Sequence, residues 1–203
     1  MRLDCVNGKL IGEEVNTFQV VETTWGTLKQ MYPNTLVVSK GTGISRPYGT
    51  FPYINPNGED YRTDQFLLFP IDIDDDRLHR KERVHGIIIN GQAKVYRTRT
   101  FQNGVTLWLD TFQHEKLLIV GDTKMNFVNS FYQTLSDGSV LEFTALQDAL
   151  PALLEDSEGN HWDIFGEAIS GQRTGQKLTP TTSFIGYWFS WGTFYPQTEI
   201  FRP

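Results

Sequence analysis

The chain has 203 residues, of which 39% are hydrophobic and 13% aromatic, so it can bury a full hydrophobic core in one domain or two small ones. Its formal net charge of −6 argues against nucleic-acid binding, which needs a basic surface. The single cysteine, Cys5, excludes an internal disulfide and a cysteine-rich zinc site within this chain.

The N-terminal residues carry no signal for export. Residues 1–14 lack the apolar run of roughly 7–15 residues that a signal peptide needs. The longest apolar run, residues 66–71, is far shorter than the roughly 20 residues that cross a bilayer. We therefore expect a soluble chain with no signal peptide and no membrane span.

The first predicted element is a short helix near residue 25. Thr23 or Thr24 can cap its N-terminus, and the helix ends before Pro33. Its large apolar side chains fall on one helical face: Trp25, Leu28, Met31 and Tyr32. An aromatic stripe of this kind usually packs into the core.

Residues 39–83 are rich in Gly, Pro, Tyr and Asp, and are too long and too aromatic for a simple flexible linker. We expect an ordered, irregular connection there. Within it, Arg46, Tyr48 and Tyr53 combine a bidentate hydrogen-bond donor with two amphipathic rings, a chemistry suited to an anion or a sugar. The alternative is structural: the tyrosines and prolines tie neighbouring parts together, and Arg46 pairs with a carboxylate.

Strand signals dominate the second half of the chain. Asn90-Gly91 between two β-prone runs predicts a hairpin over residues 86–96, because both central residues of such a turn need a positive φ. Further strands or hairpins are predicted at residues 105–109, 117–120, 127–143 and 153–164. The predicted fold class is therefore mainly β, a compact sheet or barrel-like domain with a few short helices.

The two ends of the chain match each other at an offset of 163 residues. The identical pairs are Gly8 and Gly171, Gly12 and Gly175, Trp25 and Trp188, Tyr32 and Tyr195, Pro33 and Pro196, and Thr35 and Thr198. We interpret the match as an incomplete internal duplication, with residues 1–38 as the tail of a first copy, 39–83 as the connection and 84–203 as a second, complete copy. The chain would then be the C-terminal part of a longer two-copy protein. The alternative is an asymmetric fold that reuses one small unit.

No catalytic or metal-binding pattern stands out. The acidic run at residues 72–76 departs from an EF-hand loop because Arg77 replaces the required glycine, so we interpret it as a solvated turn balanced by arginines. The four histidines form no His-x-x-x-His pair, and His161, beside Trp162, is the strongest functional candidate among them. The chain has no Gly-x-Ser-x-Gly motif. We expect no metal and no cofactor.

An ordered set of short motifs runs along nearly the whole chain: Thr24-Trp25, Tyr32-Pro33-Asn34-Thr35, Gly43-Ile44-Ser45-Arg46-Pro47-Tyr48-Gly49, Lys81-Glu82-Arg83-Val84-His85-Gly86, and Trp162-x-x-x-Gly166-x-Ala168-x-x-Gly171. In this set the chain resembles the bacterial and archaeal family of domain of unknown function 3179. The resemblance implies an upstream first copy with a Cys-Pro motif on a strand, and a periplasmic or extracellular location. The chain departs from that pattern, because no proline follows Cys5 and no export signal is present.

Two functions remain open at this point. The first is a non-catalytic extracytoplasmic module that binds a ligand or a partner, with Arg46, Tyr48, Tyr53 and His161 as candidate binding residues. Its partner would be a small molecule, an anion or a protein. The second is a fragment of an enzyme or a redox or metal protein whose active groups lie in the missing upstream copy. The sequence defines no catalytic residue.

Overall fold

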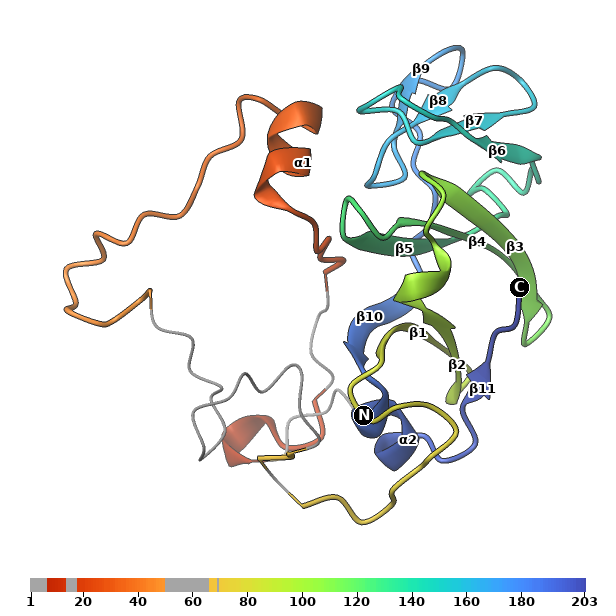
Figure 1. The fold of residues 1–203 in the computed structure, drawn as a ribbon. Helices are drawn as coiled ribbons and strands as arrows, with labels where there is room; N and C mark the ends of the chain where they lie inside the picture. The colour runs from red at the N-terminus through yellow and green to blue at the C-terminus, as the bar shows by residue number, and fades with distance from the viewer. Residues whose placement is uncertain (1–6, 14–17, 50–65, 69) are drawn as a thin grey trace.

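The protein is mainly β, as the sequence predicts, and the part of the chain that the structure describes contains three sheets and two short α-helices (Figure 1). The computed structural model describes residues 7–13, 18–49, 66–68 and 70–203. Among these residues the strands do not close into a barrel, so the barrel-like form of the prediction is not adopted. The internal duplication and the division into three segments stay predictions.

The first sheet is built on the predicted hairpin. Strands β1 (Arg83–Ile89) and β2 (Gln92–Arg97) pair antiparallel around Asn90 and Gly91, which have φ values of 51° and 74°. This confirms the hairpin prediction. Strand β10 (Thr182–Tyr187) pairs with the outer edge of β1, and β11 (Glu199–Ile200) runs parallel to β2 on the other side.

The central sheet comprises β3 (Thr106–Phe112), β4 (Glu115–Asp122) and β5 (Phe127–Tyr132) in sequential antiparallel order. The apolar run 117–120 in β4 is buried on both faces, because alternate side chains point to opposite sides of a strand. Leu117 and Ile119 pack toward β1 and β2, whereas Leu118 and Val120 pack toward the third sheet. The central sheet is thus the middle layer of the core.

The third sheet contains β6 (Phe143–Ala145), β7 (Leu154–Asp156), β8 (His161–Trp162) and β9 (Ala168–Ser170). The β7–β8 hairpin confirms the prediction for residues 153–164. The Asp156 carboxylate holds its turn, accepting hydrogen bonds from the Asn160 backbone N–H at 3.0 Å and from the Trp162 indole at 2.9 Å. Trp162 is fully buried and packs edge-on against Phe143.

The predicted hairpin over residues 127–143 is only partly correct. A turn does form at Asp137 and Gly138, with a single bridge between Thr134 and Val140. Strand β6, however, pairs with β7 rather than with β5. Turn residues set where the chain reverses, whereas the packing of the following side chains decides which strand they join.

Two helices of seven residues flank the sheets, α1 (Trp25–Met31) and α2 (Trp188–Phe194). Thr24 is the N-cap of α1, as predicted, and its side chain accepts a hydrogen bond from the Thr27 N–H at 3.1 Å. The prediction of one buried apolar face on α1 is wrong for Trp25. Met31 is buried in the core, but the Trp25 side chain is 52% exposed because α1 contacts the sheets through its Thr27 and Met31 side.

The described parts of residues 39–83 contain neither helix nor strand before β1 begins. The acidic run is balanced by arginines, as expected: Asp75 pairs with Arg77 at 2.6 Å, and Asp74 pairs with Arg80. These hydrogen bonds lower the pKa of Asp75, because the guanidinium stabilises the ionised carboxylate. The run is thereby linked to its neighbouring basic side chains.

Candidate functional site

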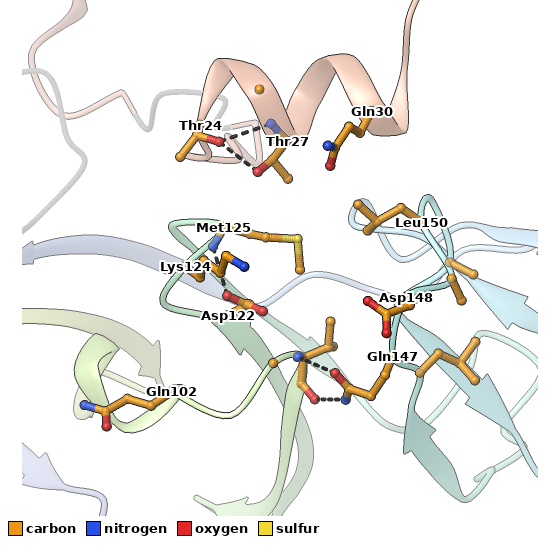
Figure 2. A pocket seen from close by; sticks show the side chains of 16 residues that line it. Thr24, Thr27, Gln30, Gln102, Asp122, Lys124, Met125, Gln147, Asp148 and Leu150 are labelled. Atoms are coloured by element: carbon orange, nitrogen blue, oxygen red, sulfur yellow. Dashed lines mark hydrogen bonds between the residues drawn. The ribbon is translucent and has the colours of Figure 1, made fainter.

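A cleft of about 820 Å³ separates α1 from the loop before β3, the β4–β5 turn and the β6–β7 loop (Figure 2). Clefts of this volume are typical of sites for small molecules. Its walls come from α1, the β4–β5 turn and two loops of the β-rich part. The lining residues with polar side chains are Thr24, Thr27, Gln30, Gln102, Asp122, Lys124, Gln147 and Asp148.

The α1 wall is set by the N-cap of the helix. The Thr24 and Thr27 hydroxyl oxygens lie 2.7 Å apart, which fixes both side chains at the start of the helix. Gln30 follows about one turn later and points into the cleft in Figure 2. The helix is held over the sheets from its N-terminal side, where the Thr24 N–H and the Thr23 hydroxyl donate hydrogen bonds to the Met125 carbonyl at 3.3 and 2.8 Å.

The floor of the cleft contains a buried carboxylate at the end of β4. Asp122 is 4% exposed, and its Oδ1 accepts a hydrogen bond from the Met125 N–H at 2.9 Å. This bond orders the β4–β5 turn, which carries the exposed side chain of Lys124. A carboxylate and an ammonium group therefore come from the same turn (Figure 2).

The opposite wall is a loop whose side chains are held by backbone contacts. The Gln147 amide accepts from the Val105 N–H at 3.0 Å and donates to the Val105 carbonyl at 2.7 Å. Asp148 follows in a left-handed conformation with φ of 53°, which Asp adopts more readily than most residues. This backbone turns its carboxylate toward the cleft (Figure 2).

The cleft combines acidic, basic and amide side chains that can donate and accept hydrogen bonds. Two carboxylates, one ammonium group and three amides surround the cleft, so its side chains carry a net charge of about −1. Among the residues that the structure describes, no histidine, cysteine or serine lines the cleft. Within the described ranges, no group of three His, Cys, Asp or Glu side chains lies close enough to hold a metal ion.

A second polar cluster is buried between β1, β5 and the residue before β10. His85 Nε2 lies 2.7 Å from Ser130 Oγ, which lies 2.6 Å from Thr181 Oγ1. Burial lowers the pKa of His85 to about 3, because the charged imidazolium would lose its hydration. Within the described part of the chain, Nδ1 of His85 has no hydrogen-bond partner, so no carboxylate orients the ring. Ser130 is fully buried, whereas His85 also lines a cavity of about 270 Å³ together with Asn129.

The residues predicted from sequence do not form one site. Arg46 and Tyr48 lie in the exposed loop after α1, where the Tyr48 and Thr42 hydroxyls are 2.9 Å apart. Tyr53 lies outside the described residues. His161 is on β8, with Nε2 3.5 Å from a Glu155 carboxylate oxygen, and Figure 1 shows that sheet far from the loop. The role of all four residues in binding stays a prediction.

The cleft residues were missed by the sequence analysis, apart from Thr24 as a helix cap. They come from four separate stretches of the chain, and none forms a local motif. The one usable signal was Asp122, a carboxylate two residues after the apolar run 117–120 and three residues before Met125, a spacing that permits an Asp-capped turn.

Comparison with known families identifies the chain over almost its whole length. A family model described as "Protein of unknown function (DUF3179)" matches residues 1–198. The chain belongs to this family. For this DUF3179 chain, neither the curated proteins nor the solved structures give a match. In the described segments of this family member, none of the helices has the length and apolar character needed to span a membrane.

Proposed function

We propose that this DUF3179 chain is a non-catalytic binding module that takes a small polar molecule into the cleft under α1. The observation that carries the proposal is the set of polar side chains converging on one concavity of about 820 Å³. Several are already fixed by other bonds: Asp122 by the Met125 N–H, Gln147 by Val105, and Thr24 by Thr27. Such preorganised groups bind with little loss of side-chain entropy.

The charges of the cleft favour some ligands over others. Asp122 and Asp148 outnumber Lys124, so an anionic ligand would meet net repulsion. A neutral or singly cationic molecule can use the carboxylates and the Gln30 and Gln102 amides as acceptors and the free amide protons as donors. The extracytoplasmic location belongs to the same proposal and is supported by the family resemblance.

The test is a thermal-shift and calorimetric titration of the full chain with three classes of probe: maltose and sucrose, choline and arginine, and phosphate and citrate. A ligand at 100 times its dissociation constant stabilises the folded state by about 2.7 kcal/mol, roughly 5–11 °C for a domain of this size. We expect a shift with the neutral or the cationic class and none with the anions.

A double variant, Gln30→Ala with Gln102→Ala, should abolish the shift. Both side chains are exposed, so their loss leaves the core intact. The matched control is Gln172→Ala, an exposed glutamine outside the cleft. Binding that survives in the double variant, or a response to anions alone, would refute the assignment of the cleft.

A further inference from the structure

A second, smaller cavity of about 270 Å³ lies where strands β1, β5 and β10 meet the segment before α1. Its lining comprises His85 of β1, residues 128–129 of β5 and residues 183–185 of β10. Residues 18–20 and 22 complete the wall. None of these residues lines the cleft under α1, so the two concavities are separate sites.

The segment before α1 is a fixed part of this wall. The Glu22 carboxylate accepts hydrogen bonds from the Arg83 guanidinium at 2.6 Å and from the Asn126 amide at 3.3 Å. The Thr23 hydroxyl donates to the Met125 carbonyl at 2.8 Å. These bonds attach the segment to the start of β1 and to the β4–β5 turn, so the cavity is enclosed by contacts of the fold itself.

His85 brings an unpaired ring nitrogen to the cavity. The side chain is 3% exposed, and its Nε2 lies 2.7 Å from Ser130 Oγ, on a residue outside the cavity wall. The side of the ring left for the cavity is therefore the side that carries Nδ1. Within the described residues, Nδ1 has no hydrogen-bond partner. Native proteins nearly always pair a buried polar atom, because leaving it unpaired is costly.

The hydroxyl groups behind the ring allow Nδ1 to be either a donor or an acceptor. Ser130 Oγ lies 2.6 Å from Thr181 Oγ1 as well as 2.7 Å from the ring. If Ser130 donates to Nε2, the ring proton is on Nδ1, which then donates. If Nε2 donates to Ser130, and Ser130 to Thr181, Nδ1 accepts. A hydroxyl group suits both states, because it can accept and donate.

The rest of the wall favours a molecule with an apolar body. Half of the ten described lining residues are apolar, namely Phe18, Val20, Val128, Phe184 and Ile185. A buried water needs two to four polar partners, which apolar side chains do not offer. An apolar cavity of about 150 Å³ can hold benzene. A cavity of about 270 Å³ therefore has room for a six-membered ring with a small substituent.

The charges around the cavity favour an uncharged ligand. Glu22 and His85 are the ionisable residues among those that line it. Burial lowers the pKa of His85 to about 3, so the ring is neutral at pH 7. An anion would be repelled by Glu22. A cation would compete with Arg83, which already pairs with Glu22 at 2.6 Å.

We propose that this cavity binds an uncharged alcohol or phenol whose apolar body is about the size of one six-membered ring. Its hydroxyl group forms a hydrogen bond with His85 Nδ1, and its ring packs against the apolar wall. The site is separate from the cleft under α1, so this inference does not depend on the proposed function.

The experiment titrates the full chain, labelled with ¹⁵N, with phenol and cyclohexanol. Toluene is the matched control, because a methyl group replaces the hydroxyl of phenol and leaves Nδ1 unpaired. Shifts of the backbone amides of residues 183–185 give the dissociation constants. We expect toluene to bind at least about tenfold more weakly than phenol. The ¹⁵N signal of His85 Nδ1 should move with phenol and cyclohexanol and stay unchanged with toluene.

The charge of the ligand is tested with benzoate and benzylamine, which place an anion or a cation on a similar ring. Both should bind at least about tenfold more weakly than phenol, because neither charge finds a free partner in the wall. A tighter complex with either ion would overturn the assignment of an uncharged ligand.

A pair of variants on β10 tests the location of the site. Ile185 lies opposite His85 on β1, so its side chain and that of Ser183 lie on the same face of the sheet as His85. Ser183→Phe should fill the cavity and abolish phenol binding. Thr182→Phe adds the same ring at the next position, on the other face, and should bind phenol like the native chain.

His85→Leu tests the hydrogen bond. Leucine is of similar size but has no ring nitrogen, and Ser130 keeps its contact with Thr181. The variant should bind phenol and toluene equally, whereas a merely structural role of His85 would leave the preference for phenol intact. Its disappearing signal also assigns Nδ1 in the native spectrum.

Three results would overturn the proposal: no shift of residues 183–185 with phenol, equal binding of phenol and toluene by the native chain, or phenol binding that survives in Ser183→Phe. The first two use the native protein and do not require a variant to fold. In the first case water would be the partner of Nδ1, and in the second the cavity would select for shape alone.

Discussion

The segments around α1 and α2 have the same local backbone but opposite environments. Trp188 is fully buried under β1 and β2, whereas Trp25, at the equivalent position, is 52% exposed. Both helices have the same length and the same turn after them. The local sequence is therefore enough to form both short helices, whereas the tryptophans of α2 are buried because the β1–β2 hairpin packs on them.

Truncation of the two tryptophans should give the largest contrast. Trp188→Ala should lower the free energy of unfolding by about 3–5 kcal/mol, because it leaves a large cavity and removes the indole hydrogen bond to the Asp75 carbonyl. Trp25→Ala should change it by less than about 0.5 kcal/mol, since the side chain is half exposed. Urea denaturation measures both, and equal losses would show that α1 is more tightly packed than its exposure indicates.

The segment around α2 also takes part in a pH-sensitive contact, which is made by the residue before β10. Thr181, which precedes β10, contacts Ser130 and through it His85, whose pKa burial lowers to about 3. The unfolded chain binds a proton near pH 6.5, while the folded chain resists it down to about pH 3. Stability should therefore be complete above pH 6.5 and fall by about 1.4 kcal/mol per pH unit below it, roughly 2 kcal/mol by pH 5.

His85→Gln removes this titration while its amide can still reach Ser130. The variant should lose less stability than the native chain between pH 7 and pH 5, as measured by urea denaturation at each pH. Carboxylates contribute equally in both proteins, so the difference between the two curves isolates His85. Parallel curves would mean that the ring is hydrated and titrates normally.

The smallest expected effect concerns the caps of the two helices. Thr24 caps α1 through its side chain, whereas Tyr187 makes no such bond at the start of α2. Thr24→Ala should cost about 1 kcal/mol and raise amide exchange in residues 25–31, and Thr24→Ser should keep the cap. If the alanine variant exchanges like the native chain, the contacts with Met125 hold α1 without its cap.

Prediction from sequence worked wherever a few neighbouring residues decide the outcome. Asn90-Gly91 defined a hairpin because both residues accept a positive φ, and Thr24 and Pro33 bounded a helix. The apolar run 117–120 indicated a buried strand, and β4 is buried on both faces. The order of short motifs was enough to predict the family.

Prediction failed where distant parts of the chain meet. Strand β6 pairs with β7, whereas the sequence predicted that residues 140–143 pair back across the Asp137-Gly138 turn. The polar cleft combines α1 with loops near residues 102, 124 and 148, which no local pattern connects. Arg46 and His161, chosen for their chemistry, lie in separate parts of the molecule (Figure 1).

The sequence by itself determined the backbone of residues 25–35 and 188–198 and of the glycine turns upstream of them. Helix caps, left-handed glycines and Tyr-Pro turns all act within a few residues. Only the tertiary structure decided that Trp188 is buried and Trp25 is not. A side chain is buried only where another part of the chain packs against it. The β1–β2 hairpin packs against α2 and not against α1. Local conformational preferences depend on neighbouring residues and can be recognised in the sequence. Hydrophobic burial needs two surfaces that pack together, and the tertiary fold determines which surfaces do so.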